Sequence, residues 1–132
     1  MIKILLAEDT PEWQKAHISF LNLYIGADKY EICAEKNAKD ALEKAKEEKF
    51  DLIITDLQME LDFEPDFAGE WLVKQIKETE KNAKTPVIIV SATYNIGFIA
   101  EKLGVRYLSK RTMLSMPDSY SYALREVLSG LD

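Results

Sequence analysis

The sequence is short of the residues that mark several common classes of protein. Its 132 residues include one cysteine, Cys33, so no internal disulfide can form, and one histidine, His17, which cannot build a histidine-rich metal site alone. Acidic residues outnumber basic ones by 23 to 17, so no basic surface for direct nucleic-acid binding is expected. No apolar run is long enough to span a membrane, and the first residues lack a signal-peptide pattern. We therefore expect a cytoplasmic protein that contacts neither membrane nor nucleic acid.

The pattern of apolar residues indicates the fold class. Short apolar runs alternate with segments of helical periodicity along the chain, as in βαβ units around a parallel sheet. Strands are predicted at about Ile2–Leu6, Tyr30–Ala34, Leu52–Thr55, Val87–Val90 and Arg106–Leu108. Helices are predicted at about Pro11–Tyr24, after the cap residue Asn37, and at about Phe67–Thr79, Asn95–Leu103 and Pro117–Ser129.

Five strands alternating with five helices predict an α/β fold. Right-handed crossovers place helices on both faces of the sheet. We predict a flavodoxin-like (βα)5 doubly wound parallel sheet with strand order 2-1-3-4-5, so that strands one and three lie side by side at the centre. A chain of this length can bury its own core, and we expect residues 1–132 to form one domain.

Charged and polar side chains follow four of the predicted strands. Glu8 and Asp9 follow the first, Asp56 the third, Ser91 the fourth and Lys110 the fifth. The carboxyl ends of parallel strands share one edge, where ligands bind. Crowded carboxylates need a cation, Mg²⁺ prefers oxygen ligands, and an aspartate beside such an ion can attack phosphorus. Each residue also has a structural interpretation, as a helix cap or a solvated loop residue.

These pieces together resemble the receiver domain of two-component response regulators. The resemblance rests on Glu8-Asp9, on Asp56 with Met59 three residues later, on Ser91-Ala92, and on the run from Tyr107 to Lys110. It covers essentially the whole chain with the pieces in the family's order.

The resemblance implies a phosphorylation site that depends on Mg²⁺. Asp56 would accept a phosphoryl group from a sensor histidine kinase or a histidine phosphotransfer protein. Asp9 would bind the ion directly and Glu8 partly through water, together with Asp56 and the backbone carbonyl of Gln58. Ser91 and Lys110 would hold the phosphoryl oxygens. No separate substrate is implied, only self-phosphorylation and autodephosphorylation at Asp56.

The resemblance also implies a switch that passes the signal to another protein. Tyr107 would move inward as Ser91 is drawn toward the phosphoryl group, a local charge event that biases a two-state element. The surface that changes would comprise the helix at about 95–103, the strand at about 106–108 and the helix at about 117–129. An unidentified downstream protein would bind there, and a homodimer through this surface is a further option.

The chain departs from the family pattern at two places. Glu60 follows Met59 where the family usually has proline, and the closing glycine is Gly69, so the acidic loop between them is longer than usual. We hypothesise that this loop overhangs Asp56 and alters partner access or phosphate lifetime. Arg111 follows Lys110 where the family usually has proline, which leaves the peptide geometry there open.

Other functions remain as alternatives. A receiver-like binding module that never uses phosphate is one, and phosphorylation by acetyl phosphate and Mg²⁺ that is lost in Asp56→Asn would exclude it. A phosphatase of the haloacid dehalogenase type is disfavoured, because position 58 holds glutamine where that chemistry needs a second aspartate. Flavin binding is disfavoured because no Ser/Thr/Gly-rich phosphate loop follows the first strand.

Overall fold

A five-stranded parallel sheet forms the centre of the molecule in the computed structural model, which describes residues 1–59 and 67–129. The order is β2-β1-β3-β4-β5, so the predicted fold class and topology are confirmed. The strands are β1 (Ile2–Ala7), β2 (Tyr30–Glu35), β3 (Leu52–Thr55), β4 (Val87–Ser91) and β5 (Arg106–Ser109). The helices are α1 (Pro11–Tyr24), α2 (Ala38–Glu47), α3 (Ala68–Ile76), α4 (Ile96–Leu103), α5 (Lys110–Ser115) and α6 (Asp118–Leu128).

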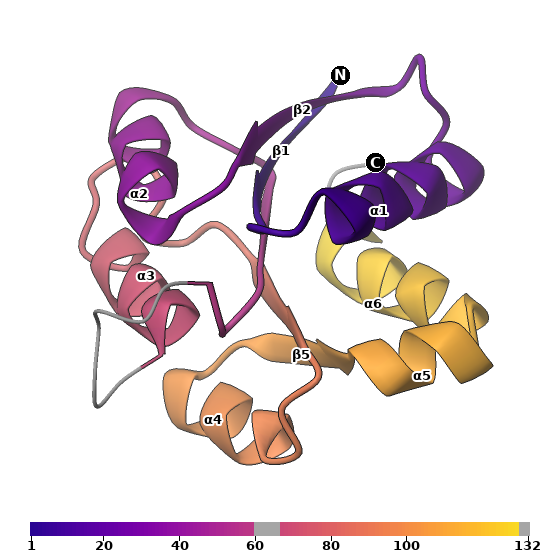
Figure 1. The fold of residues 1–132 in the computed structure, drawn as a ribbon. Coiled ribbons are helices and arrows are strands. Elements are labelled where there is room, and N and C mark those ends of the chain that lie inside the picture. Colours follow the sequence, from indigo (N-terminus) through magenta and orange to yellow (C-terminus); the bar gives the residue numbers. More distant parts are fainter. Residues whose placement is uncertain (60–66, 130–132) are drawn as a thin grey trace.

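Helices cover the sheet on both faces. Figure 1 shows α2, α3 and α4 on one side and α1, α5 and α6 on the other. The strands β3 and β4 are buried along their whole length, because alternate side chains point into two separate cores. Ile53 belongs to the core under α2, α3 and α4, and its neighbour Ile54 to the core under α1 and α6.

The ends of several helices follow from single residues. Asn37 caps α2, since its side chain accepts a hydrogen bond of 2.8 Å from the Asp40 backbone N–H. Pro11 occupies the first turn of α1, where its missing N–H costs nothing. Thr10 stands just before α1 but makes no side-chain cap hydrogen bond, and its hydroxyl donates to Asp9 instead. Gly104 ends α4 at a φ of 71°, a left-handed conformation that suits glycine.

The prediction of five helices was wrong, because the described residues contain six. The sequence predicts no helix between the fifth strand and about Pro117, where the structure has α5. Proline disfavours a helical conformation in the residue before it, so Arg111 in place of proline leaves Lys110 free to begin a helix. The predicted final helix is α6, and α3 ends at Ile76 rather than at Thr79.

A buried asparagine fastens the amino ends of β3 and β4 to the end of α2. Asn82 Oδ1 accepts hydrogen bonds from the Phe50 backbone N–H at 2.9 Å and from Thr85 Oγ1 at 2.9 Å. Its Nδ2 donates to the carbonyls of Ala45 at 2.5 Å and Glu48 at 2.7 Å. This neutral network, here called the Asn82 lock, gives hydrogen-bond partners to backbone groups that lack one within the sheet and the helix.

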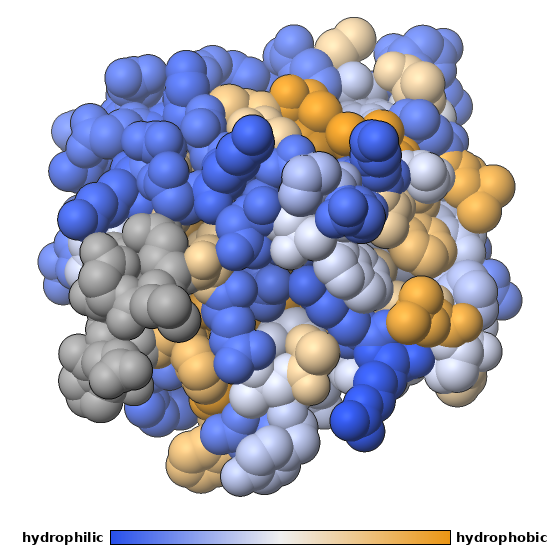
Figure 2. Space-filling model, viewed as in Figure 1, coloured by the Kyte–Doolittle hydropathy of each residue, from blue (hydrophilic) through white to orange (hydrophobic). Residues whose placement is uncertain are grey.

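The outer surface differs over the two layers of helices. Figure 2 shows hydrophilic groups over α2 and hydrophobic patches over α1 and α5. Leu23 on α1 and Leu114 on α5 are among the exposed large apolar side chains. Within residues 1–59 and 67–129, no helix combines the length and apolar character needed to cross a membrane.

Candidate functional site

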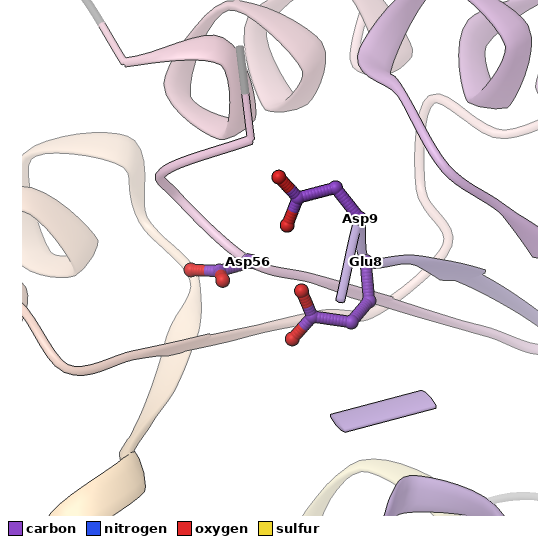
Figure 3. A group of neighbouring side chains, drawn as sticks. All are labelled: Glu8, Asp9 and Asp56. Carbon is purple, nitrogen blue, oxygen red and sulfur yellow. The ribbon is translucent and has the colours of Figure 1, made fainter. Parts of the chain in front are cut away.

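Three carboxylates meet at the carboxyl ends of β1 and β3. Ala7 pairs with Thr55 in the parallel register, and the Asp56 backbone N–H donates to the Ala7 carbonyl at 3.0 Å. Glu8 and Asp9 therefore follow one strand directly beside Asp56 on the next. One carboxylate oxygen of each residue lies within 4.8 Å of the others, and Figure 3 shows the three side chains gathered together at the ends of the two strands.

Glu8 is the most deeply buried of the three. Its side chain is fully enclosed, and its Oε2 accepts a hydrogen bond of 3.3 Å from the Thr10 backbone N–H. Burial, followed by the negative charge of Asp56, raises the pKa of Glu8 to about 7, although Lys110 acts in the opposite direction. The charge at this end of the sheet is thus only partly compensated by the protein.

Lys110 reaches into the cluster from the first turn of α5. Its Nζ donates to Asp56 Oδ2 at 2.8 Å and to Glu8 Oε1 at 3.0 Å. Burial by itself would lower the pKa of the Lys110 ammonium, but hydrogen bonds and charge attraction from Asp56 and Glu8 outweigh it, so the net pKa is raised. The ammonium therefore stays charged at neutral pH and bridges two carboxylates.

The donor set fits a hard divalent cation. Three carboxylates face one ammonium, so an excess of negative charge remains, and all the ligand atoms are oxygens of the kind Mg²⁺ prefers. Gln58 lies at the rim, and its backbone N–H donates to Asp56 Oδ1 at 3.3 Å. The predicted ligand role of the Gln58 carbonyl stays a prediction.

Gly69 brings the start of α3 against the end of β3. Its N–H donates to the Leu57 carbonyl at 2.9 Å, and a Cβ at this position would overlap the Asp56 carbonyl oxygen and lie 2.7 Å from Leu57 Cα. Only glycine allows so close an approach. Most of the long acidic loop lies outside the described residues. The hypothesis that this loop overhangs Asp56 therefore stays a prediction.

Ser91 ends β4 and is fully buried, but its hydroxyl is engaged elsewhere. Ser91 Oγ lies 3.0 Å from Thr93 Oγ1 and accepts a hydrogen bond of 3.1 Å from the Thr93 backbone N–H. The structure thus places Ser91 at the predicted edge of the sheet, in a turn with Thr93. A role in holding phosphoryl oxygens would require the hydroxyl to leave this turn.

Tyr107 lies on the surface of β5 rather than inside. Its side chain is half exposed, at 50%, and its ring packs beside Gly97 of α4, where an added Cβ would lie 3.2 Å from Tyr107 Cζ. This is the outward position from which the predicted inward movement would start. The movement itself stays a prediction.

Sequence reasoning did not anticipate two aromatic contacts near the cluster. Lys110 Nζ lies 4.5 Å from the ring centroid of Trp13, which is partly buried on the first turn of α1. His17 is buried, and its Nδ1 lies 2.9 Å from the Tyr120 hydroxyl of α6. Burial, followed by the charge of Lys110, lowers the pKa of His17 to about 3. The spacing of four residues between Trp13 and His17 is the one signal that could have placed both on one helix face.

Known proteins resemble this chain in sequence. Residues 4–114 match the family model of the response regulator receiver domain. A curated relative, the response regulator ArlR of Staphylococcus saprophyticus, is 33% identical over 92 residues, which are 70% of this chain and 36% of that protein. The chain thus spans about a third of this relative.

Solved structures share the fold at lower sequence identity. A putative response regulator from Chloroflexus aurantiacus gives a TM-score of 0.78 at 18% identity, covering 97% of this chain and 98% of that one. A signal receiver domain from Clostridium thermocellum also gives 0.78, at 23% identity, covering 96% of both chains. The receiver domain of the sensor histidine kinase PA1611 from Pseudomonas aeruginosa, with a magnesium ion coordinated in its active-site cleft, gives 0.66 at 22% identity, covering 83% and 84%.

Proposed function

This chain belongs to the response regulator receiver domain family, and from that premise we propose that Asp56 accepts a phosphoryl group from a histidine kinase or histidine phosphotransfer protein. The observation that carries the proposal is the Lys110 ammonium, 2.8 Å from Asp56 Oδ2 within a cluster of three carboxylates. The ammonium can donate hydrogen bonds to phosphoryl oxygens, and the cluster fits Mg²⁺.

The transfer follows from the positions of these groups. An Asp56 carboxylate oxygen forms a bond to phosphorus as the bond from phosphorus to the donor's imidazole nitrogen breaks, and that nitrogen takes a proton from solvent. A magnesium ion bound by Glu8, Asp9, Asp56 and the Gln58 carbonyl would supply positive charge to the phosphoryl oxygens. The Lys110 ammonium moves its hydrogen bond from the Asp56 carboxylate to a phosphoryl oxygen. The Ser91 hydroxyl gives up its hydrogen bonds with Thr93 and bonds to a second phosphoryl oxygen.

The consequence of transfer is a change on the face formed by α4, β5 and α6. Tyr107 packs beside Gly97 on α4 and follows Ser91 inward, which alters the surface offered to a downstream protein or to a second copy of this chain. We include α6 in the receiver domain, so that it extends over residues 1–132, because Phe20 of α1 stacks on Tyr120 of α6 at 4.8 Å. The domain acts as a switch and has no substrate besides its own Asp56.

Intact-mass measurement after incubation with acetyl phosphate and Mg²⁺ tests the proposal. We expect the wild-type chain to gain one phosphoryl group, and Asp56→Asn to gain none while folding normally. Asp51→Asn is a matched control, because Asp51 is a carboxylate at the amino end of β3 that accepts a hydrogen bond from the Lys3 N–H. An unmodified wild-type chain would instead favour a binding module that does not use phosphate.

A further inference from the structure

The Trp13 ring gives the Lys110 ammonium a third contact besides its two carboxylates. The ammonium lies 4.5 Å from the Trp13 ring centroid, while it donates to Asp56 Oδ2 at 2.8 Å and Glu8 Oε1 at 3.0 Å. The face of an indole carries negative electrostatic potential and attracts a cation strongly where water is excluded. The Lys110 side chain is 10% exposed, so this attraction is little screened.

A lysine ammonium needs several contacts to be held in one position. Its four-carbon stem is flexible, and its ammonium is a point charge without the fixed fork of arginine. A cation held by Glu8 and Asp9 would compete with Lys110 for the Glu8 carboxylate. Asp56 is then altered by phosphorylation, so the Trp13 ring is the one of these three partners that the reaction leaves unchanged.

The Trp13 ring is itself held in place. It contacts the His17 ring with centroids 6.4 Å apart, and His17 is buried against Tyr120 with Nδ1 and the hydroxyl at 2.9 Å. The turn that carries Trp13 is tied to the site as well, since Gln14 Nε2 donates to the Glu8 carbonyl at 2.7 Å. A fixed ring can define where a flexible ammonium lies.

We propose that Trp13 is a positioning residue for phosphoryl transfer, which holds the Lys110 ammonium over Asp56 through the face of its ring. This inference rests on the proposed function of Asp56 and adds a residue outside the strand-end cluster. The indole acts through Lys110 and touches neither the phosphoryl group nor the cation.

Rates of phosphorylation by acetyl phosphate with Mg²⁺ test the role. Trp13→Leu keeps an apolar side chain but removes the ring, and we expect the maximal rate constant to fall about tenfold. Trp13→Phe keeps a ring face and should recover most of the rate. Trp71→Leu is the matched control, because Trp71 is partly buried on α3 at the opposite face of the sheet, and its rate should equal that of the wild type.

A double substitution separates positioning from general packing. In a Lys110→Met background the ammonium is gone, so Trp13→Leu should cause no further loss of rate. The same proportional loss in both backgrounds, or a full rate in Trp13→Leu, would overturn the inference. Urea unfolding of each variant shows whether a loss of rate comes from loss of fold, and Trp13→Phe decides the matter if Trp13→Leu unfolds.

A measurement on the unphosphorylated chain distinguishes this inference from the proposed function. The Trp13 ring current should move the side-chain proton resonances of Lys110 upfield, and Trp13→Leu should abolish that shift. A reactive wild-type chain without the shift would overturn the positioning role alone. An inert wild-type chain that shows the shift would overturn the proposed function of Asp56. The contact between Trp13 and Lys110 would then be purely structural, and the positioning role would be overturned as well.

Discussion

The two ends of the sheet bury polar groups in opposite ways. At the amino end, the Asn82 lock joins a neutral amide to a hydroxyl and three backbone groups, and Asn82 is completely buried. At the carboxyl end, Glu8 and Asp56 share one ammonium beside the exposed carboxylate of Asp9, and the pKa of Glu8 is raised to about 7. Neutral groups that pair completely stabilise a fold, whereas crowded like charges leave a site ready for a cation or a phosphoryl group.

The largest expected effect tests the amino end. Asn82→Ala leaves the Phe50 N–H and the carbonyls of Ala45 and Glu48 without their partner, and each orphaned buried group is costly. We expect the free energy of unfolding to fall by about 3 kcal/mol in urea titration. Asn95→Ala is the control, because the Asn95 side chain makes no cap hydrogen bond, and it should change stability by less than about 0.5 kcal/mol. Equal losses in both variants would contradict the lock.

The next effect lies at the carboxyl end. Gly69→Ala places a Cβ on the Asp56 carbonyl oxygen, so the start of α3 must shift, and we expect a loss of about 2 kcal/mol together with slower phosphorylation. Gly97→Ala is a matched control on α4, where the atoms nearest to the new Cβ are those at the end of the Tyr107 ring. Urea titration and acetyl phosphate kinetics would show a larger loss for Gly69→Ala in both measurements. A Gly69→Ala chain with normal stability and rate would mean that α3 and β3 are not so closely apposed.

A smaller effect of opposite sign is expected from Glu8. Its raised pKa means that stability is complete below its ordinary pKa of 4.5 and is lost as pH rises through about 7. Glu8→Gln leaves Asp56 to pair with Lys110, so at pH 8 the variant should be more stable than the wild type by about 1 kcal/mol. Addition of Mg²⁺ should raise the melting temperature of the wild type and not that of Glu8→Gln. A destabilised variant at pH 8 would show that the carboxylates are better compensated than their geometry indicates.

The smallest expected effect tests whether a buried neutral pair also stabilises the contact between α1 and α6. The pKa of His17 is lowered to about 3, so its contribution to stability is complete above its ordinary pKa of 6.5 and is lost as pH falls toward 3. Between pH 7 and pH 6 the wild type should lose about 0.7 kcal/mol more than His17→Gln in paired urea titrations. Parallel pH profiles would mean that His17 accepts a proton in the folded chain.

The sequence predicted the fold because apolar runs and punctuating residues agree along the chain. Each strand was placed within one residue of its observed ends, since runs such as Leu52–Thr55 are too short for helices and Pro86 and Gly104 mark boundaries. Glu8, Asp9, Asp56 and Lys110 were predicted to meet because parallel strands end at one edge. Their meeting depends on topology alone.

What the sequence did not predict depends on contacts made by side chains across the fold. The short helix α5 has too few residues for a periodic signal, and its existence depends on Arg111 standing where the resemblance led us to expect proline. The Asn82 lock joins residues up to 37 positions apart. The contact between Trp13 and Lys110 joins the first turn of α1 to the first turn of α5, far apart in the sequence, and no local pattern encodes it.

The central place of β1 has a consequence for how the chain folds during synthesis. Residues 2–7 are synthesised before either of their partner strands, yet they pair with β2 on one side and with β3, ending at Thr55, on the other. The inner face of α1 is covered later still, because Phe20 stacks on Tyr120 of α6. The nascent chain must therefore hold an unpaired apolar strand until β2 and β3 have been made, and this early intermediate is exposed to aggregation and to chaperones.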